Sequence, residues 1–392
     1  MAKIKDKLYA RAAQQKLPLT GAFELSPVCN FKCSMCYVRK SMGEVQTQGG
    51  LRGLDFWLDV AEQAREAGTL YPLLTGGEPF LYPHFRELFQ AMCRMGMQVS
   101  INSNASCITE REVEWLTATP PERINVTLYG ATNASYGRLC GDEKGFDKVM
   151  RGVELLRENK IRFKFNCSLT PENVGELEQM VAVAREFDLG LKAASYMFPP
   201  VRRTGQCGDY AQRLSPRDAA YYQVMTDFLQ LPPEQFQRLA GNMSRFVELT
   251  PERIAEAEGK EPRAMGCLAG RCSYWVDWQG NLSACGVMDV PQLSLRELSL
   301  REAWDQVTAW AEGLRYSSAC GNCVNRGLCF SCAAMVRNET GSFQGRPVYL
   351  CETRQYAARF YREFAEKHYG KFHSPEEGSV LPPSNECALE EL

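Results

Sequence analysis

The sequence predicts an α/β fold, a partial barrel of six strand–helix units followed by a smaller Cys-rich region. Between about residues 22 and 200, short apolar runs alternate with amphipathic helical segments, which is typical of a parallel sheet covered by helices. Six units are too few for the closed eight-stranded barrel. Beyond residue 262 the chain becomes dense in cysteine, which indicates a second, smaller unit.

The strands and helices can be assigned in order. Because the active sites of such folds gather at the carboxyl ends of the strands, motifs just after a strand are the first candidates. The predicted strands are residues 22–25, 70–74, 98–102, 124–129, 162–169 and 191–197, and the predicted helices between them include 56–68, 84–96, 146–159 and 174–187. Further helices are predicted at 217–230, 251–260, 300–313 and 353–370, with a strand at 274–278.

The predicted domains follow from this pattern. An N-terminal extension (1–21) precedes the barrel (22–200), a helical bridge (201–262), the Cys-rich domain (263–369) and a loose polar tail (370–392).

Composition excludes several classes of protein. The 392 residues are 45% hydrophobic with interspersed charges and a net charge of −2, so we expect a globular protein with no nucleic-acid partner. No apolar run is long enough for a signal peptide or a membrane span, so we expect a cytoplasmic protein without a membrane partner. Seventeen cysteines in a reducing compartment indicate metal or redox chemistry.

Three cysteines lie close together just after the first strand, Cys29, Cys33 and Cys36 in CNFKCSMC. A structural zinc site needs four ligands, whereas a four-iron cluster held by three cysteines keeps one iron open for a small molecule. The alternatives are a zinc site completed by a distant cysteine, and three unrelated buried cysteines.

The second strand ends in Thr75-Gly76-Gly77-Glu78-Pro79. Two glycines let the backbone approach a ligand closely, and a nearby carboxylate with free carbonyls can hold an ammonium group. CNFKCSMC and GGEP, one strand–helix unit apart, resemble the cluster and methionine-binding motifs of the radical S-adenosylmethionine (SAM) superfamily. The resemblance continues through INSNAS (101–106) and VTLYGAT (126–132) and covers about half the chain.

This resemblance implies a set of cofactor contacts. Cys29, Cys33 and Cys36 would hold a [4Fe–4S] cluster whose open iron chelates SAM, and Gly76, Gly77 and Glu78 would bind its amino group. Asn102, Asn104 and Thr127 are candidates for the ribose and Arg138 for the SAM carboxylate. For the first three, satisfaction of local backbone is an equal alternative. Two residues depart from the family pattern, Met35 where an aromatic is usual and Tyr129 where many members have Asp.

A second array contains eight cysteines after residue 262. Two four-ligand zinc sites would explain them, since paired CxxC motifs are typical of zinc ribbons. The array also resembles the SPASM extension of radical SAM enzymes, which implies two auxiliary [4Fe–4S] clusters. By that pattern one would be held by Cys267, Cys272, Cys285 and Cys332, and the other by Cys320, Cys323, Cys329 and Cys351. The family pattern usually has three residues between the preceding cysteine and the one equated with Cys332, whereas this chain has two.

A few other residues are catalytic candidates. Among the remaining cysteines, which include Cys140 and Cys167, only Cys207 is singled out, and Tyr37 and Asp277 are further candidates. Arg202 and Arg203 fit a solvated surface pair better than a site for a substrate carboxylate.

The resemblance implies reductive cleavage of SAM to a 5′-deoxyadenosyl radical, which abstracts hydrogen from a substrate. Members with the SPASM extension mostly act on peptides, so we expect oxidation or crosslinking of a ribosomally made precursor peptide. Reduced flavodoxin or ferredoxin would donate electrons, and a separate protein would recognise the leader peptide. Alternatives are oxidation of a small metabolite and protein oxidation like that of sulfatase-maturating enzymes, in which Asp stands at the position of Gly286. A zinc-bearing scaffold protein is the alternative outside enzymes.

Overall fold

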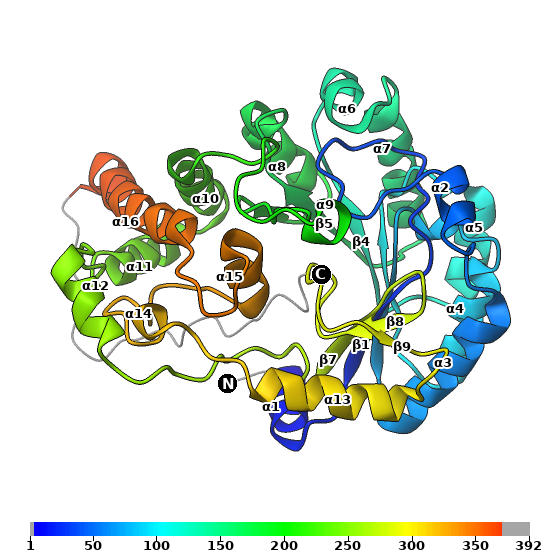
Figure 1. Cartoon of the computed structure of the whole chain (residues 1–392). Coiled ribbons are helices and arrows are strands. Elements are labelled where there is room, and N and C mark those ends of the chain that lie inside the picture. The colour runs from blue at the N-terminus through cyan, green and yellow to red at the C-terminus, as the bar shows by residue number, and fades with distance from the viewer. Residues whose placement is uncertain (1–3, 371–392) are drawn as a thin grey trace.

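The computed structural model describes residues 4–370. Its centre is a curved sheet whose strand order is β6-β5-β4-β3-β2-β1-β7-β8-β9, and Figure 1 shows helices covering its outer side. The strands are β1 (Thr20–Glu24), β2 (Tyr71–Thr75), β3 (Ser100–Ser103), β4 (Arg123–Thr127), β5 (Phe163–Ser168), β6 (Leu191–Ala194), β7 (Ser273–Val276), β8 (Asn281–Ser283) and β9 (Leu293–Ser294). The predicted α/β fold with six parallel strands is confirmed.

The sheet contains one parallel strand more than expected. β7 comes from the Cys-rich region and pairs in parallel with β1, from Thr20 opposite Ser273 to Phe23 opposite Val276. β8 and β9 continue the sheet as antiparallel strands. The Cys-rich region therefore contributes directly to the sheet of the barrel.

The helices fall into two groups in Figure 1, one around the sheet and one beside it. The first comprises α1 (Ile4–Gln15), α2 (Met42–Thr47), α3 (Leu54–Ala67), α4 (Phe85–Arg94), α5 (Glu110–Ala118), α6 (Asn133–Cys140), α7 (Gly145–Glu158), α8 (Leu177–Arg185) and α13 (Leu300–Glu312), with short 3₁₀ helices η1 (Pro79–Leu81) and η2 (Val174–Glu176). The second comprises α10 (Pro216–Gln230), α11 (Pro233–Met243), α12 (Pro251–Glu258), α14 (Ser318–Gly321), α15 (Ala333–Thr340) and α16 (Val348–Tyr369). The short helix α9 (Val201–Thr204) lies next to β5 in Figure 1.

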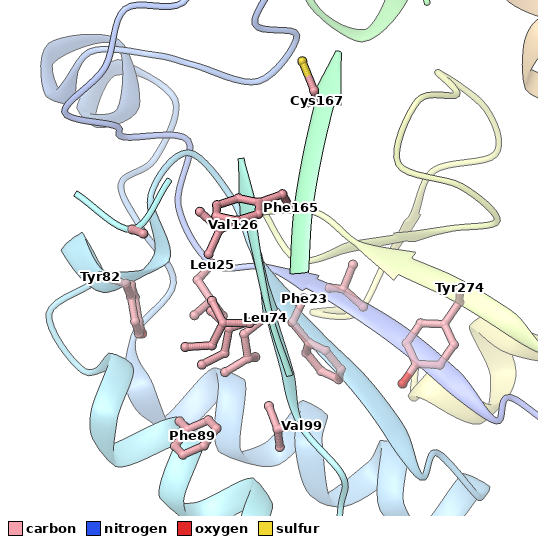
Figure 2. Packing of buried hydrophobic residues seen from close by; sticks show 14 of the residues in the cluster. Phe23, Leu25, Leu74, Tyr82, Phe89, Val99, Val126, Phe165, Cys167 and Tyr274 are labelled. Carbon is pink, nitrogen blue, oxygen red and sulfur yellow. The ribbon is translucent and has the colours of Figure 1, made fainter. Parts of the chain in front are cut away.

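The main hydrophobic core lies between the sheet and its helices. Alternate strand residues point outward, and Figure 2 shows Phe23, Leu25 and Leu74 directed toward the helix that carries Phe89. Phe23 packs edge-on against Trp57 of α3, with ring centroids 6.1 Å apart. The residues between these, such as Glu24, face the concave side. The face that carries Glu24 also holds a small buried cluster of Ala22, Leu73 and Trp275.

A second, smaller core joins α10, α11 and α16. α16 packs along α10 and α11, and the buried side chains there include Val224, Phe236 and Tyr361. Within residues 4–370, no helix has the length and apolarity that a membrane span requires. Apart from Gly370, the predicted loose tail (370–392) lies outside the described residues.

Candidate active site and cluster-binding loops

The loop after β1 carries Cys29, Cys33 and Cys36, and all three are half-buried. Burial, with the nearby charges of Glu78 and the other two thiols, raises the pKa of Cys29 to about 12. Two of the sulfurs accept hydrogen bonds from backbone amides. Phe31 N donates to Cys29 Sγ at 3.4 Å, and Arg39 N donates to Cys36 Sγ at 3.3 Å. Donors of this kind are typical of iron–sulfur ligands.

The glycine loop after β2 packs directly against this cysteine loop. Gly77 N donates to Ser26 O at 2.7 Å, and Glu78 N donates to Val28 O at 2.9 Å. A Cβ on Gly76 would lie 2.3 Å from Ser26 O, and one on Gly77 would lie 2.3 Å from Val28 O. No side chain fits at either position, so the two glycines let the backbones meet and form a cradle beside the cysteines.

Glu78 connects this cradle to the loop after β3. Its fully buried carboxylate accepts hydrogen bonds from Ser103 Oγ at 2.9 Å, Asn104 N at 2.8 Å and Phe80 N at 3.3 Å. Burial raises the pKa of Glu78 to about 7, although the three hydrogen bonds oppose this shift. The carboxylate thus joins the loops after β2 and β3.

The predicted SAM contacts lie at different distances from the cysteines. Asn104 is the nearest, because its Nδ2 lies 3.7 Å from Cys29 Sγ. Asn102 is on the concave face of β3, where its Oδ1 accepts from Asn125 Nδ2 at 2.6 Å. Thr127 ends β4 and is half-buried.

Arg138 lies on α6 with 53% of its side chain exposed. It approaches the carboxylates of Glu172 at 3.8 Å and Glu176 at 4.0 Å. It is therefore already engaged by two acidic side chains. The roles of all these residues toward SAM remain predictions.

A buried ion pair lies between the barrel and the Cys-rich region. Glu24 is 1% exposed and accepts from both terminal nitrogens of Arg202, at 2.9 and 3.1 Å, and from Trp275 Nε1 at 3.0 Å. The expectation that Arg202 belongs to a solvated surface pair is wrong, because its side chain is 13% exposed and paired with Glu24. Glu24 was not among the predicted site residues. A glutamate at the end of a buried strand could have indicated a buried charge that needs a partner.

Two consecutive arginines of α9 connect the cysteine-bearing loops. Arg202 Nη1 donates to Gly286 O at 2.6 Å, directly after Cys285, and Arg203 Nη1 donates to Cys36 O at 2.6 Å. Tyr37 lies among these groups, and burial together with Glu24 raises its pKa. The structure thus places Tyr37 near both Cys36 and Cys285, whose charges act on its hydroxyl.

The other two catalytic candidates lie elsewhere. Asp277 accepts from Gln279 N and Asn281 N, both at 2.9 Å, so it organises the turn between β7 and β8. Cys207 lies near Gly341 at the end of α15, where an added Cβ would be 4.0 Å from its sulfur. These contacts give Asp277 a structural role and leave that of Cys207 a prediction.

Four cysteines of the second array line one cavity, which opens to solvent. They are Cys320, Cys323, Cys329 and Cys351, the set that the SPASM resemblance assigns to one auxiliary cluster. Burial raises the pKa of Cys351 to about 12. Four arginines also line the cavity, Arg253, Arg326, Arg346 and Arg354. Thiolates enclosed by cations fit an anionic metal cluster.

The remaining four cysteines come from scattered positions around β7. Cys272 is buried directly before β7, Cys285 follows β8, and Cys332 caps α15. The charges of Cys267 and Cys332 both act on Tyr316, so these two lie near one hydroxyl. Within residues 4–370, no three His, Cys, Asp or Glu side chains converge closely enough to hold a single metal ion.

Comparison with protein families gives one match, and residues 23–184 fit the family described as the Radical SAM superfamily. Among curated proteins, the AdoMet-dependent heme synthase of Methanosarcina barkeri is 24% identical over 348 residues, which cover 84% of this chain and 95% of that protein. The subtilosin biosynthesis protein AlbA of Bacillus subtilis is 23% identical over 327 residues, covering 81% of this chain and 67% of AlbA. The PqqA peptide cyclase of Rhizobium meliloti is 23% identical, with 75% of each chain covered.

Solved structures share the fold over most of the chain. The protein anSMEcpe with bound AdoMet superposes with a TM-score of 0.64 at 17% identity, covering 89% of this chain and 93% of that one. Streptococcus suis SuiB bound to its precursor peptide SuiA gives a TM-score of 0.62 at 16% identity, covering 88% and 80%.

Proposed function

Because the chain belongs to the radical SAM superfamily, we propose that it is an iron–sulfur enzyme that modifies a peptide by hydrogen abstraction. In this proposal Cys29, Cys33 and Cys36 would hold a [4Fe–4S] cluster that leaves one iron for SAM. The observation that carries it is the direct contact between the cysteine loop and the glycine cradle. When bound, such a cluster supplies the electron that cleaves SAM to methionine and a 5′-deoxyadenosyl radical.

The protein's own residues bind and orient SAM. Gly76 and Gly77 would offer backbone groups to the amino group, and their lack of side chains lets this backbone lie directly against the cysteine loop. Glu78 holds the cradle in place by accepting hydrogen bonds from Ser103 and Asn104 at the end of β3 and from Phe80 in its own loop. Asn102, Asn104 and Thr127 remain the proposed ribose contacts, at the ends of adjacent strands.

The Cys-rich region would hold two auxiliary clusters, for three [4Fe–4S] clusters in all. The cavity lined by Cys320, Cys323, Cys329 and Cys351 supports one of them. The set formed by Cys267, Cys272, Cys285 and Cys332 would hold the other. With four cysteines each, these clusters have no open iron and would carry electrons.

A peptide substrate is supported by the names of two relatives. AlbA acts in subtilosin biosynthesis and the other is named PqqA peptide cyclase, and SuiB shares the fold and has been seen with its precursor peptide. We propose oxidation or crosslinking of a ribosomally made peptide, with a separate leader-recognition protein and reduced flavodoxin or ferredoxin as electron donor. We place the enzyme in the cytoplasm.

A second candidate is the oxidation of a small metabolite. It is favoured by the relatives named AdoMet-dependent heme synthase, one of which is matched over 95% of its length, and a tetrapyrrole is then the substrate to test. A sulfatase-maturase activity is disfavoured, because a Cβ on Gly286 would lie 2.4 Å from the Trp275 ring. That position has no room for the aspartate expected of such an enzyme.

The test is substrate-dependent formation of 5′-deoxyadenosine by the anaerobically reconstituted protein, measured by liquid chromatography and mass spectrometry. Candidate precursor peptides and iron porphyrins are added separately, and Cys33→Ala is the inactive control. Stimulation by a peptide with a matching loss of peptide mass supports the first candidate, and stimulation by a porphyrin supports the second. Absence of deoxyadenosine under all conditions would overturn both.

A further inference from the structure

The concave face of the sheet is polar and basic along β4, β5 and β6. Successive residues of a strand point to opposite faces, and Val126, Phe165 and Leu191 belong to the main core on the outer side (Figure 2). The residues that alternate with them therefore point inward. On these three strands, the ionisable residues at inward positions are all cations, namely Arg123, Lys164 and Lys192.

The register of the strands arranges the inward residues in two rows. In the first row Asn125 lies opposite Lys164, and in the second Asn166 lies opposite both Thr127 and Lys192. Lys164 and Lys192 are thus on adjacent strands and in adjacent rows, and both are half-buried. With side chains of this length, both ammonium groups can reach one anionic group inside the barrel.

The other side of the barrel has a different charge pattern. Glu24 at the end of β1 is engaged by Arg202 and Trp275, and Asp277 after β7 accepts from the turn that follows it. Cations gathered on one wall of a recess, where the dielectric constant is low, attract anionic ligands. The charge pattern of β4–β6 therefore favours a ligand that carries a carboxylate.

Asn166 lies in the middle of this basic wall. Its Oδ1 is buried, and no donor within residues 4–370 lies at hydrogen-bonding distance from it. A buried acceptor without a donor is costly and rare in folded proteins, so this oxygen is suited to a donor that arrives with a ligand. A peptide N–H is such a donor, whereas the nitrogens of a metal porphyrin carry no hydrogen.

We propose that the inward face of β4–β6 binds a carboxylate of the substrate through Lys164 and Lys192, beside a peptide N–H that donates to Asn166 Oδ1. This inference rests on the proposed function and names its substrate class, a peptide with an acidic residue in the bound segment. Thr127, a proposed ribose contact, lies in the same row as Asn166 and Lys192. The bound segment therefore lies next to the proposed SAM site. A propionate of a tetrapyrrole offers the same carboxylate, and the experiment separates the two sources.

The experiment measures binding by the full, anaerobically reconstituted protein in the presence of SAM. An array presents many dodecapeptide sequences, each in one version with glutamate and one with glutamine at the same position. Heme and its dimethyl ester provide the same comparison for a tetrapyrrole. Lys164→Gln and Lys192→Gln each remove one charge, and Lys192→Arg keeps it. Lys260→Gln is the matched control, because it removes one charge from an exposed pair with Glu256.

We expect the glutamate versions to bind more tightly than the glutamine versions. Lys164→Gln and Lys192→Gln should each weaken binding of a glutamate version by about tenfold or more, as the loss of a hydrogen bond to a charged group does. Lys192→Arg and Lys260→Gln should change it little. Asn166→Ala should weaken the two peptide versions equally, because the N–H is present in both.

Preferential binding of heme over its ester, lost in the Lys→Gln variants, with no preference among the peptides, would support the carboxylate site and overturn the peptide as its source. Equal binding in both comparisons would overturn the site itself. These comparisons need only the unmodified protein, so they do not depend on the folding of any variant.

Weaker binding of SAM in the Lys→Gln variants would assign the lysines to SAM and overturn the inference, while the proposed function would stand. If the unmodified protein shows charge-dependent binding but forms no deoxyadenosine, the proposed function fails and the carboxylate site remains.

Discussion

Glu24 is a carboxylate buried at the end of a strand. It accepts hydrogen bonds from Arg202 and Trp275, and of these two only Arg202 is charged. Replacing one partner of a buried ion pair leaves the other charge uncompensated, which typically costs about 3–5 kcal/mol. We therefore expect Glu24→Gln to lower the free energy of unfolding by an amount of that order. Thermal and denaturant unfolding of the cluster-free protein would measure it.

Glu110 provides a matched control for this prediction. It pairs with Arg151 at 3.1 Å, but both side chains are more than two-thirds exposed. Exposed pairs of this kind are weak because solvent screens them, so Glu110→Gln should change stability little. Similar losses in the two variants would show that the buried pair has no special role. The double variant Glu24→Gln, Arg202→Met should lose less than the sum of the two single variants.

Glu78 gives a pH dependence of stability with a defined sign. Burial raises its pKa from 4.5 in the unfolded chain to about 7 in the folded protein, so the folded state binds this proton more tightly. The stabilisation is fully present below about pH 4.5 and is lost as the pH rises through about 7, with a total on the order of 3 kcal/mol.

Glu78→Gln should remove this part of the pH dependence. The melting temperature of the cluster-free variant, followed from pH 4.5 to 8, should fall less steeply than that of the unmodified protein. Parallel curves for the two proteins would contradict the raised pKa.

Individual site residues were predictable only where a short motif contains them. Gly76, Gly77 and Glu78 stand next to one another in the chain, so one short motif was enough to single out all three as candidates. Glu24 could not be recognised in this way, because its partners Arg202 and Trp275 are 178 and 251 residues away in the sequence.

At the level of elements, the join between β1 and β7 depends on a glycine. A Cβ on Gly21 would lie 2.2 Å from the ring of Tyr274, and that ring is buried with its hydroxyl 3.0 Å from Thr69 Oγ. Gly21→Ala forces the ring to move, and overpacking of this kind typically costs about 1–3 kcal/mol. We expect a corresponding drop in melting temperature.

Gly53→Ala is the control for the Gly21 variant. No atom lies within 4 Å of a Cβ at Gly53, and its φ is −74°, so alanine fits there without strain. A large loss of stability in this variant as well would point to a general effect of removing glycine.

Strands with a regular pattern and clear boundaries were predictable, and six of them were assigned to nearly the correct residues. The run at 274–278 was recognised as a strand, but its partner was not. A short, largely apolar run can pair with any open edge, and only the folded barrel shows that β1 offers one. The end of α16 was also close to its predicted position, whereas its start at Val348 came five residues earlier than expected.

At the level of the whole molecule, the proposed clusters are held by separate parts of the chain. Three [4Fe–4S] clusters require about twelve irons per chain. Replacing Cys323 and Cys351 by alanine should remove about four of them, because both residues line a single cavity. Iron assays would measure this loss. The change in the electron paramagnetic resonance spectrum when SAM is added should remain, and deoxyadenosine analysis should still show slow cleavage of SAM without substrate.

Cys33→Ala should have the opposite effect. It should abolish cleavage of SAM while most of the iron stays in the Cys-rich region. Retention of cleavage in this variant, or loss of cleavage after the cavity substitutions, would contradict the division of roles between the two cysteine arrays.

The position of β7 beside β1 also restricts how such enzymes can be recombined. A chain ended at residue 262 would lack β7, and the N–H and C=O groups of β1 on that side would form a new open sheet edge. Such an edge is a template for pairing between copies. An exchange of C-terminal halves between relatives must therefore bring a strand that completes the recipient's barrel, as well as cysteines for its clusters.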